Sequence, residues 1–178
     1  MMDETVISLQ HVDNASDFVD RFALEWRRTR PEIDVTGVAG LLRVLRLAAH
    51  LDRELALLCV HQGLKPGQFQ VLAALRRRDP QPLTATELAA AAILTSGAMT
   101  PILDKLEAQG MIRRQADDAD RRARCVSITA KGRGIIDRAL DLRMARHREL
   151  NGVLDGDERA ALASILRKLL LAVEKPAV

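Results

Sequence analysis

The segment from Leu83 to Arg133 constrains the fold more than any other part of this 178-residue chain. Up to Gly110 it carries two short helical patterns separated by a break in the periodicity. The apolar and small residues of the two patterns have the spacing by which two crossing helices pack against each other. Beyond Gly110 the periodicity changes, because residues 111–115 and 124–128 have strand-like composition and flank the charged segment ADDADRRA. A helix-turn-helix followed by a basic hairpin is a winged helix. We therefore expect an all-α fold with a small β-hairpin wing.

The rest of the chain is predicted to be helical. Apolar residues recur at helical spacing in five more segments, each bounded by capping or stopping residues. Ser16 is a good N-cap for the first segment, which places Phe18, Phe22 and Trp26 on one stripe. Asp155 opens a capping box for the last segment. The five segments cover approximately residues 16–30, 38–61, 66–78, 130–150 and 156–173.

We expect three parts along the chain. Residues 1–63 hold the N-terminal dimerisation helices and a possible ligand cleft, 64–133 the winged helix, and 134–178 the C-terminal dimerisation helices. The apolar stripe of the last helices can pack on the 38–61 helix, on a second subunit, or on both. Because two-fold dimers are the commonest oligomers, we predict a homodimer, which would set two reading heads roughly 34 Å apart.

The scarcity of aromatic residues excludes several binding modes. Three Phe, one Trp and no Tyr leave a core of aliphatic side chains, which suits helices better than sheets. Single-stranded DNA channels and RNA-recognition sheets stack bases on aromatic platforms, and so few rings cannot line such a surface. The nucleic-acid partner that fits a winged helix with this composition is duplex DNA.

Cysteine usage and the N-terminus indicate the compartment. Cys59 and Cys125 lack the paired spacing of a disulfide framework, which favours a reducing environment. The N-terminus is acidic and has no apolar core of signal-peptide length, and no run approaches the roughly 18 apolar residues of a membrane span. We expect a cytoplasmic protein with no membrane partner.

Basic residues are concentrated in one stretch. The chain as a whole carries a formal charge of +3, which decides no partner. Between Met111 and Arg133, however, seven basic residues face three acids, a local charge of +4. Such a strip is typical of a phosphate-binding surface, although on charge alone a solvated loop is an equal alternative. The basic residues are Arg113, Arg114, Arg121, Arg122, Arg124, Lys131 and Arg133.

The second helix of a winged-helix turn motif enters the major groove, so its exposed residues are candidates for readout. Hydroxyls and backbone amides near the helix start suit phosphates and base edges, and Lys105 suits a phosphate. Arginines at the hairpin tip suit a narrow minor groove, with Asp120 aiming one of them. The alternatives are an ordinary amphipathic helix and a solvated loop. The candidate DNA-binding residues are Thr95, Ser96, Gly97, Thr100, Pro101, Lys105, Arg121, Arg122 and Arg124, with Asp104 on the same face.

Pro101 is unusual in this helix. It lies about five residues from the expected start, beyond the first turn, where a missing N–H costs nothing. Either the helix starts later than expected, or it is kinked at its reading face.

The stretch LTATELAAAAILTSGAMTPILDKLEAQGMIRRQADDADRRARCVSITAKG resembles the multiple-antibiotic-resistance regulator (MarR) family of winged-helix repressors. The wing pattern of that family, Asp-x-Arg followed by a strand ending in Leu-Thr, is matched by Asp120, Arg122 and Ile128-Thr129. The resemblance covers roughly residues 38–173. It implies a dimer formed by helices from both chain ends, in agreement with the uncovered apolar stripe.

Within this family the chain is most similar to the urate-responsive, PecS-like branch. The resemblance rests on the extra N-terminal helix with Trp26, on SGAMT and on GLKPGQFQVLAALRR. The branch uses an aspartate and an arginine beside the tryptophan, whereas this chain has Gln70 and Ile102 at those positions. Because a charged partner for an anionic ligand is lost, we do not predict urate. The family as a whole implies release from DNA by a small, often aromatic, organic acid.

The 38–61 helix offers a polar stripe that can meet the carboxylate of such an effector. Trp26 and Phe69 would supply flat apolar walls, with Gln70 beside them. The alternatives are a solvated charged face and aromatic packing. The candidate ligand-binding residues are Trp26, Arg43, Arg46, His50, Phe69 and Gln70.

The sequence predicts neither an enzyme nor a metal or cofactor site. His50 and His61 would lie about 16 Å apart along one helix, too far for one metal ion. Phosphate loops and nucleophile elbows are missing. We therefore predict a transcriptional regulator, in this family most often a repressor, that binds a pseudo-palindromic duplex and is released by a small-molecule effector. The alternative is a DNA-binding protein of the same fold that is independent of ligand or controlled by a partner.

Overall fold

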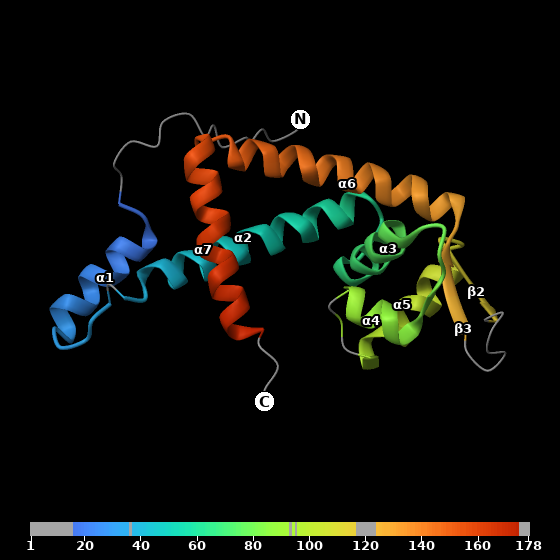
Figure 1. Ribbon diagram of the computed structural model, residues 1–178, viewed down its shortest axis with the longest axis horizontal. Coiled ribbons are helices and arrows are strands. Elements are labelled where there is room, and N and C mark those ends of the chain that lie inside the picture. Colours follow the sequence, from blue (N-terminus) through green and yellow to red (C-terminus); the bar gives the residue numbers. More distant parts are fainter. Residues whose placement is uncertain (1–15, 36, 93, 95, 117–123, 175–178) are drawn as a thin grey trace. The chain divides into compact units, whose positions relative to one another are not determined.

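The computed structural model describes residues 16–35, 37–92, 94, 96–116 and 124–174. These residues form helices and one small antiparallel sheet (Figure 1), which confirms the predicted fold class. The helices are α1 (Phe18–Thr29), α2 (Ala39–His61), α3 (Pro66–Arg78), α4 (Ala85–Ala92), α5 (Ser96–Ala108), α6 (Ala130–Asn151) and α7 (Gly156–Val173). The strands are β1 (Leu83–Thr84), β2 (Ile112–Ala116) and β3 (Arg124–Ile128).

The chain divides into two compact units. The terminal unit joins the residues up to Arg43 to those from Ala145 onward, and the central unit spans Val44–Met144. This division differs from the three ranges expected from the sequence because α2 and α6 are continuous, and the boundary between the units falls inside each of them. The predicted winged helix lies wholly within the central unit.

Helix α3 is the middle of the hydrophobic core of the central unit. Residues 71–75 are consecutive and no more than 5% exposed, so neighbouring elements cover this helix on all sides. Leu88 of α4, Leu106 of α5 and Ile136 of α6 are fully buried in the same cluster. Apart from Phe69, the buried side chains of this cluster are aliphatic or contain sulfur, as the composition requires.

Local capping fixes where the helices begin. Asp17, not the predicted Ser16, caps α1, because its carboxylate accepts the N–H of Asp20 at 3.0 Å and Asp20 returns the same contact. At α4, the hydroxyl oxygen of Thr84 accepts the N–H of Glu87 at 3.3 Å, and Glu87 accepts the N–H of Thr84 at 2.8 Å. The predicted box of Asp155 at α7 is confirmed.

The sheet has the strand order β1-β3-β2, and both pairs are antiparallel. Strands β2 and β3 form the predicted hairpin, with Ile112 opposite Ile128 and Ala116 opposite Arg124. Strand β1 was not predicted; its two residues pair with Val126 and Cys125 of β3. This third strand attaches the wing to the start of α4.

The start of α6 packs tightly against the turn between α5 and β2. The hydroxyl of Thr129 lies 2.8 Å from the carbonyl oxygen of Gly110 and 3.0 Å from that of Met111, and it accepts the N–H of Gly132 at 3.1 Å. The Lys131 ammonium donates to the carbonyl oxygen of Gln109 at 2.7 Å. A Cβ at Gly132 would lie 2.2 Å from the Met111 carbonyl oxygen, so only glycine permits this approach.

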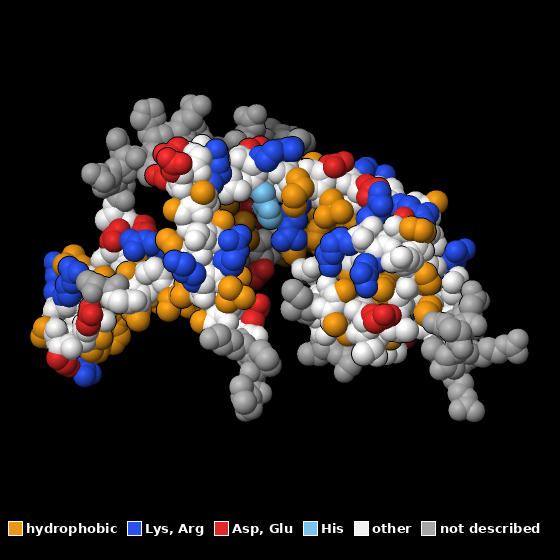
Figure 2. Space-filling view, in the orientation of Figure 1, with side chains coloured by type: hydrophobic (Ala, Val, Ile, Leu, Met, Phe, Trp, Pro, Cys, Tyr) orange, Lys and Arg blue, Asp and Glu red, His pale blue; other side chains and the backbone are white. Residues whose placement is uncertain are grey.

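The terminal unit leaves many apolar side chains at its surface, as Figure 2 shows for one face. Val19 and Val35 are buried, but no residue of α7 is. This exposure agrees with the uncovered apolar stripe expected from the sequence. The large exposed apolar residues of α7 are Leu162, Ile165, Leu169, Leu170, Leu171 and Val173.

In the part of the chain that the structure describes, no single helix is long and apolar enough to cross a membrane. Helix α4 and residues 97–108 reach that length and composition only as a pair, which is bent by 103°.

We predict that Gly132→Ala lowers the free energy of unfolding by about 3 kcal/mol, because the new Cβ meets backbone that cannot move without displacing the α5–β2 turn. Gly134→Ala is the matched control in the same helix. Its Cβ would meet only the end of the Arg138 side chain, at 3.7 Å, so helix propensity should stabilise this variant by about 0.5–1 kcal/mol. Urea unfolding measures both. Equal stabilities would show that the turn does not restrict α6.

Candidate nucleic-acid interface

Helix α5 presents one exposed and one buried face. Met99, Leu103 and Leu106 are at most 3% exposed and anchor the helix in the core. The residues exposed on the other side, as expected for a recognition helix, are Gly97, Thr100, Pro101, Asp104, Lys105 and Ala108. Ser96 is the first helical residue, and Thr95 lies outside the described residues.

Pro101 lies inside α5, which begins at Ser96, so of the two alternatives a later helix start is wrong. Proline has no N–H to donate to the carbonyl oxygen of Gly97, four residues earlier. Both residues are exposed on the reading face of the helix.

The wing contributes one described arginine to the candidate interface. Arg124 is exposed at the first position of β3, where the hairpin opens toward its tip. The predicted tip residues Arg121 and Arg122, and Asp120 beside them, lie outside the described residues. Arg124 is therefore the described basic residue that is nearest in sequence to the predicted tip residues.

The basic strip is not a uniform phosphate-binding surface. Arg113 donates to the hydroxyl of Ser127 at 2.9 Å, and Arg114 pairs with Asp104 and Glu107. Lys131 is bound to a carbonyl oxygen, as described above, and Arg133 pairs with an acid that follows α3. The concentration of basic residues agrees with the position of the wing, but Arg114 and Arg133 are paired with acids and add little net charge to a surface that would meet DNA.

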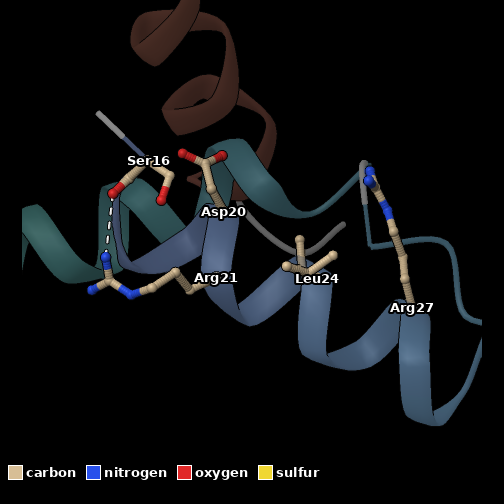
Figure 3. A pocket seen from close by; sticks show the side chains of 6 residues that line it. Ser16, Asp20, Arg21, Leu24 and Arg27 are labelled. Atoms are coloured by element: carbon tan, nitrogen blue, oxygen red, sulfur yellow. Dashed lines mark hydrogen bonds between the residues drawn. The ribbon is translucent and has the colours of Figure 1, made fainter. Parts of the chain in front are cut away.

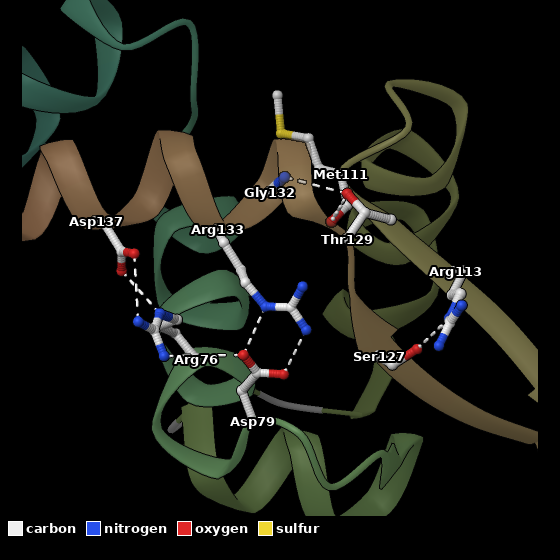
Figure 4. Close-up of polar contacts among 9 residues, drawn as sticks. All are labelled: Arg76, Asp79, Met111, Arg113, Ser127, Thr129, Gly132, Arg133 and Asp137. Carbon is white, nitrogen blue, oxygen red and sulfur yellow. Dashed lines mark hydrogen bonds and ion pairs between the residues drawn. The ribbon is translucent and has the colours of Figure 1, made fainter.

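Two arginines and two aspartates tie α3 to α6 (Figure 4). Arg133 donates to both carboxylate oxygens of Asp79, at 2.6 and 2.7 Å. Arg76 donates to Asp137 at 2.8 Å and lies 3.8 Å from Asp79. The hydrogen bonds from Arg133 hold the pKa of Asp79 below its ordinary value. The network fixes the end of the first helix of the winged module to α6.

The candidate ligand residues Trp26 and Arg43 lie in the terminal unit. Trp26 is half-buried in an aromatic row, with its ring centre 6.1 Å from that of Phe22. Arg43 contacts the carboxylates of Asp17 and Asp20, each at 2.7 Å, so its charge is already paired. A pocket of about 300 Å³ along α1 (Figure 3) is lined by Ser16, Asp20, Arg21, Ala23, Leu24 and Arg27.

The other candidate ligand residues lie in the central unit. Arg46 and His50 are exposed on α2, and the His50 Nδ1 atom lies 3.0 Å from a guanidinium nitrogen of Arg53. Gln70 is half-buried on α3. The ring of Phe69 is only 1% exposed and packs in the core, where the sequence suggests a wall open to ligand. The difference arises because the apolar Phe69 ring gains more from burial in the hydrophobic core than from exposure at a pocket wall.

Two functional candidates were not singled out by the sequence. The Arg143 guanidinium of α6 lies 5.3 Å from the centre of the Phe69 ring, and no acidic partner for it is found among the described residues. Arg114 joins β2 to α5. No local sequence pattern indicates either contact. Arg143 and Phe69 are distant in sequence, and Arg114 meets its two acids on a different element of the fold.

The architecture defines a winged helix-turn-helix protein, a class that binds duplex DNA. A family model described as MarR family matches residues 62–123. The regulator PecS of Dickeya dadantii is 27% identical over 82% of this chain and 88% of its own length. The regulator MhqR of Bacillus subtilis is 32% identical over 60% of this chain and 72% of its own length.

Solved structures agree with these sequence relatives. A MarR-family regulator from Silicibacter pomeroyi superposes with a TM-score of 0.66 at 26% identity, over 83% of this chain and 98% of that one. A cysteine-to-serine mutant of Escherichia coli MarR, complexed with operator DNA, gives a TM-score of 0.63 at 27% identity, over 82% and 97%. The chain belongs to the MarR family. Its relatives are transcriptional regulators and not enzymes.

The pairing of Asp79 with Arg133 predicts a pH-dependent stability. A carboxyl whose pKa is lowered in the folded protein adds stability above its unfolded value, near 3.8, and loses it as the pH falls through the lower folded value. We expect Asp79→Asn to be less stable than the wild type at neutral pH, by a margin that shrinks in acid. Urea midpoints across this range measure the margin. The exposed Asp141→Asn on α6 is the control, and a margin that does not change with pH would contradict the prediction.

Proposed function

We propose that the protein is a homodimeric transcriptional repressor of the cytoplasm, which binds a pseudo-palindromic DNA duplex and is released by a small aromatic organic acid. The observation that carries the DNA-binding part is the exposed face of α5, backed by a buried face and flanked by a wing. Thr100 and Lys105 offer a hydroxyl and an ammonium to phosphates and base edges. A relative with this fold was crystallised with operator DNA, which supports the proposal.

The apolar surface of α7 supports the proposed dimer. Six large apolar side chains exposed on an 18-residue helix would be costly in water unless a partner covers them. A two-fold axis would bring the same face of a second copy against them and present two recognition helices to successive major grooves. The operator would then be a pseudo-palindrome with half-sites about one helical turn apart.

The wing would add contacts beside the recognition helix. Arg124 is exposed at the edge of the hairpin, and Arg121 and Arg122 follow the same basic pattern in the sequence. Guanidinium groups are attracted to the narrow minor groove, where the negative potential is strong. Because the other described arginines of the basic strip are engaged within the protein, we assign the wing's DNA contacts to these three residues.

The effector would be recognised by its carboxylate. On α2, Arg46 and His50 are exposed side chains that can pair with or donate to an anion. Arg143 of α6, held over the Phe69 ring, and Gln70 are further candidates within the central unit. Arg43 is a weaker candidate because a ligand would have to displace two carboxylates. Release would follow if the acid binds more tightly to a conformation whose half-site spacing no longer fits DNA.

We predict that replacing a wing arginine, as in Arg124→Ala or Arg122→Ala, weakens binding to every duplex sequence. The slope of log K against log salt should fall by about one unit for each phosphate that the protein no longer neutralises. Fluorescence anisotropy with a labelled duplex at several salt concentrations measures the slope. Arg148→Ala, an exposed arginine near the end of α6, is the matched control. An unchanged slope in the wing variants would remove these arginines from the interface.

We predict that a small aromatic carboxylate releases the labelled duplex, and the emission of Trp26, the only tryptophan, tests whether the terminal unit responds as well. Benzoate, salicylate and phenylacetate are suitable probes. Arg46→Ala should weaken the response roughly tenfold, because a charge-assisted hydrogen bond is lost. Arg138→Ala on α6 is the control. If no probe changes either signal while the duplex still binds, control by a partner or constitutive binding replaces the ligand-responsive function.

A further inference from the structure

The central observation is an acid on the reading face of α5 that is held by an arginine of the wing. The Asp104 side chain is 58% exposed, yet one of its oxygens lies 2.7 Å from a guanidinium nitrogen of Arg114. The Arg114 side chain is only 22% exposed. Asp104 is therefore oriented from the side of β2 while most of its surface remains open to whatever meets the recognition helix.

Arg114 is itself anchored by a second acid of the same helix. Its guanidinium donates to one Glu107 oxygen at 3.1 Å, and its backbone N–H donates to the other at 3.2 Å. Glu107 thus fixes both the backbone and the guanidinium of Arg114, and the same guanidinium contacts Asp104. Anchored in this way, Arg114 is a positioning residue for the Asp104 carboxylate.

A carboxylate on a face that approaches DNA normally opposes binding, because it repels phosphates. The adjacent guanidinium offsets much of that charge. Arg114 contacts one oxygen of Asp104 and leaves the second one available. An ionised carboxylate is an acceptor and never a donor, so this second oxygen can bind only a hydrogen-bond donor. Thr100 precedes Asp104 by one helical turn on the same exposed face, so this acceptor lies among the residues that would meet base edges.

We propose that Asp104 is a specificity-determining residue that selects a cytosine in each half-site of the duplex, and this inference rests on the proposed function in DNA binding. In the major groove cytosine presents an amine donor without a neighbouring acceptor. Adenine presents an amine beside the N7 acceptor, which would repel the carboxylate, and guanine and thymine present acceptors there. An ionised acid held in one orientation therefore favours cytosine over the other three bases.

The test is a selection from a pool of random-sequence DNA duplexes, performed in parallel with the wild-type protein and two variants. Wild-type protein should enrich a pseudo-palindrome with one cytosine position per half-site that depends on Asp104. In Asp104→Ala the preference at that position should fall about tenfold, with the other positions unchanged. In Asp104→Asn the amide oxygen still accepts from Arg114, so an NH2 donor replaces the second carboxylate oxygen, and the preference should move from cytosine to a base that presents acceptors, above all guanine.

The outcomes separate this inference from the proposed function. If the wild type enriches no sequence and binds no duplex, the proposed function and the inference both fail. If the wild type selects a pseudo-palindrome and both variants select the same one, Asp104 reads no base. A uniform loss of preference at all positions would show that Asp104 only holds the helix in place, which also overturns the inference.

Stability measurements keep the comparison interpretable. Asp141→Asn, an exposed acid on α6, is the matched control and should select the wild-type sequence. Urea midpoints and circular dichroism should show that both Asp104 variants remain folded, and Asp104→Asn is the more conservative because it retains the hydrogen bond to Arg114. A shift from cytosine to an acceptor-bearing base in a folded Asp104→Asn variant cannot arise from loss of structure.

Discussion

The close approach of α6 to the turn after α5 is the constraint on which the winged module depends. Gly132 permits the contact, since any side chain would strike the Met111 carbonyl oxygen, and the Thr129 hydroxyl connects the two segments by hydrogen bonds. Met111 directly precedes β2, and Gly110 lies in the turn that follows the recognition helix. The same few atoms therefore set the end of the recognition helix, the start of the wing and the start of α6.

Several charged side chains of this module form ion pairs within the protein. Arg133 and Arg76 fasten α6 to α3, and Arg114 fastens the wing to α5. Arg114 and Arg133 are therefore less available to a polyanion than the exposed Arg124. A modest formal charge can thus coexist with binding to DNA, because the position of the cations matters more than their number.

The sequence predicts what is encoded locally. Caps and stops located the helices, as at Asp155 with Glu158 and at Gly63, whose backbone angle φ is +67°. The face of α5 also followed from periodicity. The tertiary contacts could not be predicted in this way. Arg133 and Asp79 are 54 residues apart in the sequence. The two residues of β1 are too few to show a strand pattern of their own. The burial of Phe69 under Arg143 likewise depends on how α3 meets α6, which no local pattern contains.

The boundary between the two units falls inside α2 and α6, so the connections between the units are hydrogen-bonded rods instead of loops. A continuous helix has no residue whose backbone can rotate freely. A change in the direction of its axis must be spread over several turns as gentle bending, or be concentrated where the helical hydrogen bonds are broken. Motion of one unit against the other would therefore be elastic, with a restoring force that grows with displacement. Sequence changes that soften α2 or α6 at these points would make bending of the connection easier without altering the recognition helix or the wing.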